Sequence, residues 1–445
     1  MERFDVLIFR IFIPLTNYKF CIMFSIKNYN FKGKKALIRV DFNVPLNHNR
    51  QITDDTRIRE CLPTINKVLN DGGAVILMTH LGRPNGYEAD YSLTPLAPLL
   101  SKLIGRNVIF TRDLFGPKTH DFAKNLKMGE VIMLENLRFY PEEERGDEKF
   151  AAEIASLADV YINDAFATSH RAHTSVCTVA KKFPEGKKFF GLLMENEIEN
   201  LDKLLRDAPA PFTAIIGGAK VSTKIGVLRN LVDKVDNLII GGGMAFTFLK
   251  ALGGKVGSSI YEEDKIESAR QIVQEVMLKG VNLYLPTDML VSSGFSNEAE
   301  FMTVSADNVP DGWMGLDIGP KTRRRFAEII NNSQTILWNG PMGVFEMENF
   351  RQGTKSIAIA VAGATISGSF SLVGGGDSVA AINQYNLADQ MSYVSTGGGA
   401  MLEYLEGREL PGIQVIRGNN KENKPKKASE RAAPVAKKRV IRKLR

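Results

Sequence analysis

Short, continuous apolar runs alternate with longer stretches of helical periodicity along most of this chain. The runs that predict strands are 36–40, 74–78, 131–134, 160–163, 212–216, 237–240, 281–285, 335–338 and 371–373. Continuous rather than alternating hydrophobicity is typical of strands that helices cover on both faces. The pattern therefore predicts an α/β fold built on mainly parallel sheets.

The length of the chain indicates more than one domain. With 445 residues, it is too long for one hydrophobic core of ordinary size, which predicts two domains. Between the two halves, residues 191–209 combine helical periodicity with charged faces. We expect this segment to form a connecting helix that acts as a hinge.

The first 22 residues differ from the rest of the chain. Residues 1–22 are apolar, but Arg10, Pro14 and Lys19 interrupt them and no small-residue cleavage site follows. No run in the segment is long enough to cross a membrane. Three interpretations are open: a mis-assigned translation start with Met23 as the true first residue, an ordered extension, or a targeting peptide. We favour the first.

The positive charge of the chain is concentrated at residues 414–445. This segment holds 12 Lys and Arg against 2 Asp and Glu, a balance of +10; because the whole chain has a net charge of +7, the remainder sums to −3. High charge with few large apolar residues predicts disorder. The tail is either an arm that binds nucleic acid, ribosomes or acidic membranes, or a solvated extension without a partner. The second alternative is favoured.

The cysteines exclude two classes of protein. Cys21, Cys61 and Cys177 are scattered along the chain, which predicts neither a disulfide framework nor a zinc site. We therefore expect a cytoplasmic protein without a membrane anchor.

Charged side chains in the first half follow the predicted strands directly. Ligands of parallel sheets bind beyond the carboxyl ends of the strands, and arginine suits carboxylate and phosphate groups. A single arginine there is more often a surface ion pair, but a set of cations at one sheet edge predicts an anionic substrate, with a phosphate and perhaps a carboxylate. The residues at these positions are Asp41, Phe42, Asn43, Arg57, His80, Leu81, Gly82, Arg83, Arg138, His170 and Arg171.

The second half carries glycine triplets instead. They occupy 241–243, 374–376 and 397–399, each after an apolar run, and such turns bring phosphates close to the backbone at a helix N-terminus. Lys220 and Lys224 follow another strand, where a flexible point charge can accompany a moving phosphate. Asp377 is either a Mg²⁺ ligand or a helix cap. The signatures of P-loop enzymes, dinucleotide-binding folds and protein kinases are absent from the sequence.

Ten motifs, read in order, carry a family resemblance. They are RVDFNVP, THLGRP, LENLRF, NDAFATSHRAH, GGAKV, GGGMAFTFLK, WMGLDIGP, WNGPMGVFE, GGGDS and STGGGA. Together they resemble the phosphoglycerate kinase family over residues 24–413. Two departures are minor: Met401 stands where the family often has Ser, and Ala167 where Gly is common.

The resemblance implies reversible phosphoryl transfer from 1,3-bisphosphoglycerate to ADP, giving 3-phosphoglycerate and ATP, by a monomer. It implies two Rossmann-like lobes, an N-terminal one at 23–190 that binds the glycerate and a C-terminal one at 210–392 that binds Mg-nucleotide. Residues 191–209 would join them, and 393–413 would return to the first lobe. The substrate residues would be those at the strand ends of the first half. The nucleotide residues would be Lys220, Lys224, Gly241, Gly242, Gly315, Asn339, Val344, Glu346, Gly375, Gly376, Asp377 and Ser378, with Mg²⁺ on Asp377.

The chemistry of this reaction agrees with the residues. A carboxylate acceptor is already ionised at neutral pH and needs no general base. The reaction requires in-line placement and charge neutralisation, for which we predict Arg57, Lys220 and the backbone N–H groups of Gly376 and Gly399. Two alternatives are another acid kinase and a catalytically reduced protein that binds nucleic acid through its tail. Intact Arg57, Lys220 and Asp377 argue against the second.

Overall fold

The computed structural model describes residues 24–418 of the chain. The segment 1–22 and the tail beyond Gly418 lie outside the described residues, so the expectations for them stay predictions. Helix α16 (Pro411–Arg417) continues past residue 413. Residues 414–417, which were expected to begin the tail, are therefore part of a helix that buries Ile416.

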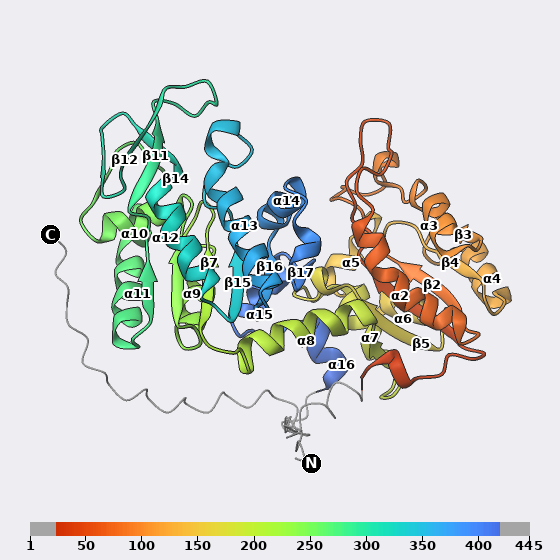
Figure 1. Cartoon of the computed structure of the whole chain (residues 1–445). Helices are drawn as coiled ribbons and strands as arrows, with labels where there is room; N and C mark the ends of the chain where they lie inside the picture. The colour runs from red at the N-terminus through yellow and green to blue at the C-terminus, as the bar shows by residue number, and fades with distance from the viewer. Residues whose placement is uncertain (1–23, 419–445) are drawn as a thin grey trace, which may run out of the picture.

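The first lobe is built on a six-stranded parallel sheet (Figure 1, right). Its strands lie in the order β3 (Val108–Phe110), β4 (Val131–Met133), β2 (Ala74–Met78), β1 (Lys35–Val40), β5 (Val160–Asp164) and β6 (Lys188–Phe190). Ile38 packs in the same core as Ile65 of α2 (Thr56–Asn70), whereas its neighbour Leu37 faces the opposite core. Both faces of the sheet are thus covered, as the continuous apolar runs predicted.

The second lobe repeats this architecture. Its parallel sheet has the order β10 (Asn282–Tyr284), β8 (Asn237–Ile240), β7 (Phe212–Ile216), β15 (Thr335–Asn339), β16 (Phe370–Gly374) and β17 (Tyr393–Ser395). All nine predicted strands are present, and each end lies within one residue of its predicted position. The α/β fold with two lobes is confirmed.

Several strands lack a readable hydrophobic signal. β3, β6 and β17 have three residues each and were not predicted. β4 and β10 are equally short, but they lie within the longer apolar runs 131–134 and 281–285. β17 belongs to the second sheet although it was expected in the returning segment. A small antiparallel sheet joins β12 (Phe301–Ser305), β11 (Asp288–Ser292) and β14 (Met314–Ile318), and β9 (Lys255–Val256) pairs with β13 (Asn308–Val309). β12 is largely exposed, so no continuous apolar run marks it.

Helices cover both sheets. Those of the first lobe include α3 (Leu96–Ile104), α4 (Pro117–Asn125), α5 (Glu142–Arg145), α6 (Glu148–Ala155) and α7 (Val179–Lys181). Those of the second lobe are α9 (Ile225–Val232), α10 (Met244–Ala251), α11 (Ile266–Leu278), α12 (Pro320–Asn331), α13 (Gln352–Ile366) and α14 (Gly376–Gln384). None of the helices between residues 24 and 418 is long and apolar enough to cross a membrane.

Helix α8 (Leu192–Arg206) runs from one lobe to the other (Figure 1). At its first turn, Asp164 Oδ1, at the end of β5, accepts hydrogen bonds from the backbone N–H groups of Leu193 and Met194 at 3.0 and 3.2 Å. Near its last turn, Lys203 Nζ lies 4.1 Å from the centre of the Phe370 ring of β16. The helix is therefore attached to both sheets.

The chain then returns towards the first lobe through α15 (Gly399–Leu405) and α16. Tyr404 donates a hydrogen bond to Asp202 of α8 at 2.6 Å. The Gly412 N–H donates to the Ser169 carbonyl of the first lobe at 2.9 Å. The last described elements therefore connect both lobes to the helix between them.

Candidate functional site

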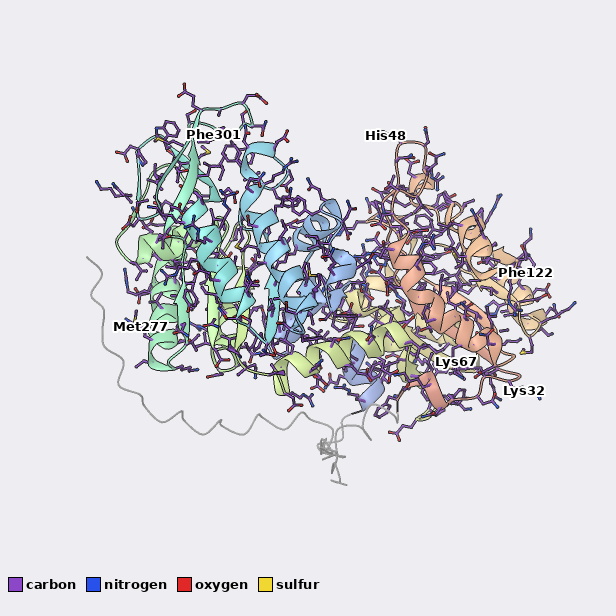
Figure 2. The ribbon with its side chains drawn as sticks, in the orientation of Figure 1. Lys32, His48, Lys67, Phe122, Met277 and Phe301 are labelled. Atoms are coloured by element: carbon purple, nitrogen blue, oxygen red, sulfur yellow. The ribbon has the colours of Figure 1, made fainter. Side chains whose placement is uncertain are left out.

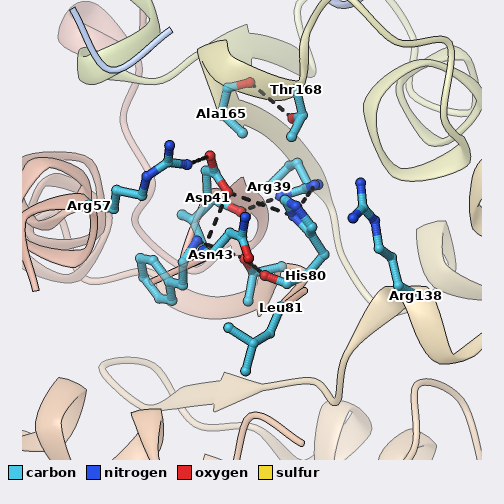
Figure 3. Close-up of polar contacts among 12 residues, drawn as sticks. Arg39, Asp41, Asn43, Arg57, His80, Leu81, Arg138, Ala165 and Thr168 are labelled. Carbon is cyan, nitrogen blue, oxygen red and sulfur yellow. Dashed lines mark hydrogen bonds and ion pairs between the residues drawn. The ribbon is translucent and has the colours of Figure 1, made fainter. Parts of the chain in front are cut away.

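The first lobe gathers charge around Asp41, directly after β1 (Figure 3). Asp41 is buried, and its Oδ2 accepts a short hydrogen bond from the half-exposed Arg57 at the start of α2. His80, after β2, places Nδ1 3.7 Å from Asp41 Oδ1. Burial and the positive charge of the nearby arginines hold the pKa of His80 well below its usual range. The ring is therefore neutral in this site.

Arg39, one residue before the end of β1, lies beneath this group and was missed by the sequence analysis. Its side chain is fully buried, and one terminal nitrogen lies 3.2 Å from His80 Nδ1. Its Nε donates to Ser175 Oγ at 2.8 Å. An arginine within a buried strand was the available signal, because charged side chains are rarely buried without a partner. The prediction considered residues that follow the ends of strands, and Arg39 lies within a strand.

The backbone of Gly82 forms hydrogen bonds with two further candidate substrate residues, Asn43 and Arg138. The Gly82 N–H donates a hydrogen bond to Asn43 Oδ1 at 2.9 Å.

 Gly82 has φ +63°, and a Cβ at this position would lie 2.2 Å from the Tyr91 ring. Only glycine fits this turn without strain. The Gly82 carbonyl accepts a hydrogen bond from Arg138 at 2.5 Å, so the turn orients both Asn43 and Arg138.

The loop after β5 contributes His170 and Arg171. Arg171 Nε donates to His170 Nε2 at 3.2 Å, and a Cβ on Gly399 would lie 3.7 Å from the same nitrogen. Burial lowers the pKa of His170, and it lowers the pKa of the nearby His173 to about 4. Both histidines are therefore neutral at pH 7, and His170 faces the third glycine triplet.

Of the remaining substrate candidates, Phe42 and Leu81 are buried and Arg83 is exposed. The Phe42 and Leu81 side chains are buried in the core, and their backbone N–H groups donate to Thr79 and Asn136. The structure therefore gives these two residues packing positions. Arg83 is exposed, which leaves its guanidinium accessible to a ligand.

The first glycine triplet of the second lobe allows three backbones to meet. A Cβ on Gly242 would lie 2.6 Å from the Gly218 nitrogen and 2.8 Å from the Pro341 oxygen. Gly241 would meet the Met342 sulfur at 2.3 Å. These glycines permit the loops after β7, β8 and β15 to pack together, which is a structural reason for them in addition to the proposed contact with a nucleotide.

The two candidate lysines have different surroundings. Lys220 is exposed, whereas Lys224 is buried and its Nζ donates to the Asn339 carbonyl at 3.1 Å and, in a shorter contact, to Asn339 Oδ1. Burial lowers the pKa of Lys224 to about 8, and the charge of Asp377 opposes that shift. Asn339 Nδ2 in turn donates to the Gly374 carbonyl at 2.7 Å, so Lys224 is held against the ends of two strands.

The second triplet forms the entry to α14. Gly375 has φ +95°, and a Cβ there would meet Asn339 Nδ2 at 2.5 Å, whereas Gly376 faces open space. Ser378 Oγ is buried and accepts from the Gly340 N–H at 2.5 Å. Asp377 is exposed in the first turn of α14. A glycine cradle beside one free-standing carboxylate fits Mg²⁺ that is shared with phosphate oxygens.

No group of three or more potential metal ligands of the His, Cys, Asp and Glu type occurs among residues 24–418.

The remaining nucleotide candidates are Gly315 in β14 and two residues of the loop after β15, Val344 and Glu346. The Gly315 N–H donates to Ser259 Oγ at 2.9 Å, and a Cβ at Gly315 would lie 2.0 Å from the Phe246 ring. The Val344 N–H donates to the Leu316 carbonyl at 2.8 Å. Glu346 is exposed near this loop, so its carboxylate is accessible to a ligand.

A small crevice lies between the end of β1 and the loop that precedes α15. Its lining comes from the β1 end, α2, the loop after β5, α8 and the loop before α15: Asp41, Arg57, Phe166, Ala167, Leu193 and Thr396. Glu197 of α8 is buried and accepts from Ser395 Oγ at 2.8 Å and from the Thr396 N–H at 2.7 Å. The crevice thus ends at a loop that α8 holds in place. The sequence analysis did not identify Glu197 or Thr396, because their pairing crosses almost two hundred positions.

The chain is similar to known proteins over most of its length. The family model described as phosphoglycerate kinase matches residues 26–408. A phosphoglycerate kinase from Porphyromonas gingivalis is 51% identical over 417 residues, covering 88% of this chain and 100% of that protein. The solved structure of phosphoglycerate kinase from Coxiella burnetii is 41% identical, with a TM-score of 0.80, and covers 88% of this chain and 98% of its own. That of the enzyme from Pyrococcus horikoshii is 32% identical, with a TM-score of 0.76, and covers 89% and 98%. The chain therefore belongs to the phosphoglycerate kinase family.

Proposed function

We infer that this chain catalyses reversible phosphoryl transfer from 1,3-bisphosphoglycerate to ADP, giving 3-phosphoglycerate and ATP. Family membership over residues 26–408 supports the reaction. The single structural observation that carries it is that two parallel sheets each carry a different set of candidate residues at their strand ends: arginines and histidines on one, glycine loops with lysines on the other. One set suits a small phosphorylated acid and the other suits a nucleotide.

In the first lobe, the candidate residues that would contact the charged groups of the substrate differ in how exposed they are. Arg57, Arg83 and Arg171 have exposed or half-exposed side chains, and planar guanidinium groups bind phosphate or carboxylate through paired hydrogen bonds. Arg138 and His80 are more buried and would position the ligand. Asp41 and Asn43 would contact its hydroxyl and carboxyl end.

In the second lobe, Lys220 and Lys224 would hold the phosphates that move. Gly375, Gly376 and Ser378 would hold the other phosphates at the start of α14. Gly241, Gly242, Gly315, Val344 and Asn339 would border the nucleoside, with Glu346 on the ribose. Asp377 would hold Mg²⁺, which would supply neutralisation of phosphate charge when bound.

The proposed mechanism needs positioning and charge rather than proton transfer. In the direction that consumes ATP, the 3-phosphoglycerate carboxylate is already ionised, so it attacks without a base. The attacking and leaving oxygens lie in line with the transferred phosphorus. Arg57, Lys220 and the N–H groups of Gly376 and Gly399 would stabilise the charge on the moving group, each such donor lowering the barrier by about 3 kcal/mol.

Because the two ligands bind to separate lobes, we propose that α8 acts as a hinge and that reaction follows closure of the lobes. The domain boundaries then follow the expected order: a first lobe at 23–190, the hinge at 191–209, a second lobe from 210, and a returning segment that ends with α16. We expect a cytoplasmic monomer.

A coupled assay with ADP and 1,3-bisphosphoglycerate tests this function. The purified chain should produce ATP, and Lys220→Ala should reduce kcat roughly a hundredfold. Lys234→Ala, which changes a lysine just beyond the C-cap of α9, serves as the matched control and should keep the wild-type rate. Absence of turnover by the folded wild-type chain would contradict the proposal.

The basic tail carries a separate prediction. If it binds nucleic acid weakly, the full chain should bind single-stranded RNA with an affinity that falls steeply as salt rises. A variant that ends at Gly418 keeps α16 and should lose this binding without losing phosphoryl transfer. Equal RNA binding by the two proteins would exclude the tail as the binding arm.

A further inference from the structure

Beneath the candidate substrate site, a buried arginine and a buried glutamate are joined by one serine hydroxyl. Arg39 is 1% exposed and Glu143 of α5 is 1% exposed. Ser175 Oγ accepts from Arg39 Nε at 2.8 Å and donates to Glu143 Oε1 at 2.6 Å. The other carboxylate oxygen, Oε2, accepts from the Ser175 N–H at 2.9 Å. Since a buried charge is costly unless it is paired, these three residues form one unit.

Ser175 belongs to a π-helix, Thr174–Thr178. Hydrogen bonds join this helix to several neighbouring residues. Tyr161 OH lies 2.9 Å from the Ser175 carbonyl. Thr174 Oγ1 donates to the Glu142 carbonyl at 2.7 Å, and Thr178 Oγ1 donates to the Gly146 carbonyl at 3.1 Å. Single-turn π-helices are rare and occur frequently at functional sites. Here the irregular turn holds Ser175 Oγ at a fixed position.

The opposite end of Arg39 reaches the substrate site through His80 (Figure 3). An arginine is always protonated and only donates, so the 3.2 Å contact from its terminal nitrogen makes His80 Nδ1 an acceptor. Asp41 Oδ1, at 3.7 Å from Nδ1, is too distant for a hydrogen bond. The proton of the neutral ring is then on Nε2. Because Arg39 itself is buried, it acts on a ligand through His80.

We propose that Glu143, acting through Ser175 Oγ, is a positioning residue that holds Arg39 against His80 and so presents an Nε2–H donor to the anionic substrate. The proposal rests on the function inferred for this site. It assigns a role to two residues that lie outside the strand-end motifs and have no exposed surface. A ring that turned over or changed tautomer would present a lone pair to an anion instead of a donor.

Two variants test the proposal in the full chain. Ser175→Ala removes the connecting hydroxyl and should raise the KM for 3-phosphoglycerate roughly tenfold, with the KM for ATP unchanged. Glu143→Gln keeps the shape but places an amide N–H₂ opposite one of the two Ser175 donors, so it should also raise the KM for 3-phosphoglycerate. Simple loss of a negative charge beside an anion site would instead lower that KM, and a lower value would overturn the proposal.

The matched control is Thr178→Val. It removes a hydroxyl from the same π-helix, the one that binds Gly146 and does not contact Arg39. This variant should lose thermal stability as Ser175→Ala does while keeping the wild-type KM for 3-phosphoglycerate. An equal rise of KM in both variants would mean that the serine is merely structural.

Nitrogen-15 NMR of the histidine rings gives a readout that does not depend on turnover. The wild-type spectrum should show His80 as the Nε2–H tautomer, assigned by its absence in His80→Gln, and Ser175→Ala should convert it to a mixture. Unchanged His80 signals in both Ser175→Ala and Glu143→Gln would overturn the proposal. An inactive wild type with a single His80 tautomer would contradict the proposed function and leave the positioning role supported.

Discussion

Lys220 and Lys224 are four residues apart, yet only Lys224 is buried. Its pKa is lowered to about 8 from 10.5. Raising the pH from 7 to 9 should therefore deprotonate it in the free enzyme and weaken the affinity for Mg-ADP up to about tenfold, since each pH unit above a pKa removes tenfold of the charged form. Calorimetric titration at the two pH values measures this effect.

Two variants separate Lys224 from other sources of pH dependence. Lys220→Ala should bind more weakly at both pH values but retain the decrease between them. Lys224→Met, which keeps the length of the side chain without its charge, should bind equally weakly at pH 7 and pH 9. A full decrease in the Lys224→Met variant would assign the titration to another group.

At the scale of residues, the sequence predicted which residues belong to the candidate site better than it predicted their burial and their neighbours. The strand-end rule identified Asp41, Arg57 and His80, and the structure places these three together. It could not predict that Arg39, within the strand, completes the group. The rule also could not separate buried Phe42 from exposed Arg83, because burial depends on α2 and on loops that fold back from other parts of the chain.

The glycine loops can be separated experimentally into those that pack and those that face a ligand. Gly242→Ala would force a Cβ to within 2.6 Å of the Gly218 backbone at a φ of +64°. We expect it to lower the free energy of unfolding by about 2 kcal/mol or more, from strain and overpacking. Thermal or chemical denaturation measures this loss. A stability equal to that of the wild type would show that the two loops can move apart enough to accept the methyl group.

Gly376→Ala is the counterpart in the second triplet. Its Cβ would face open space and its φ is ordinary, so stability should remain within about 0.5 kcal/mol of the wild type. The methyl group would occupy the place proposed for nucleotide phosphates, so the KM for ATP should rise at least severalfold. A normal KM for ATP would remove Gly376 from the proposed site.

The connection between β5 and α8 contains a pH-sensitive carboxyl group. Burial raises the pKa of Asp164 to about 7 from 3.8, so the folded state retains a proton that the unfolded chain releases above pH 4. This contribution to stability is complete below pH 3.8 and is lost as the pH rises through 7. Between pH 5 and pH 8 it removes on the order of 2 kcal/mol from the free energy of unfolding.

Asp164→Asn tests this linkage. The amide oxygen can still accept from the first turn of α8, but the group no longer titrates, so the decrease in stability between pH 5 and pH 8 should shrink by that amount. Urea denaturation at the two pH values gives the difference. Asp317, whose pKa is also raised to about 7 by burial, should continue to contribute in both proteins. An identical pH dependence of wild type and variant would exclude Asp164 as the source.

At the scale of elements, continuous apolar runs were sufficient for nine strands because helices cover both faces of each sheet. The same criterion could not find β12, which is mainly exposed, or the short strands β3, β6 and β17. The equally short β4 and β10 were found because longer apolar runs contain them. The π-helix at Thr174–Thr178 depends on contacts with Tyr161 and α5. No local periodicity in the sequence indicates it.

At the scale of the whole molecule, order along the chain predicted two lobes and a helix between them, but the attachments of that helix needed the structure. Glu197, in the middle of α8, is tied to the loop that carries the third glycine triplet. The same loop lines the crevice beside Arg57. The proposed hinge motion of α8 would therefore move a glycine loop of the second half relative to the candidate substrate residues of the first.

Closure of the lobes can be measured between their outer ends. Phe122 and Met277 are exposed and lie at opposite sides of the molecule in Figure 2, and Cys61 and Cys177 are buried. A Cys21→Ser/Phe122→Cys/Met277→Cys variant, labelled with a donor and an acceptor dye, should transfer energy more efficiently when 3-phosphoglycerate and Mg-ADP are both bound than with either alone. Glu197→Ala should reduce this additional increase while leaving the affinity for each single ligand within about threefold, because the substitution lies outside both ligand sets. If the doubly liganded enzyme shows the same transfer as the free enzyme, reaction must occur without the proposed hinge motion.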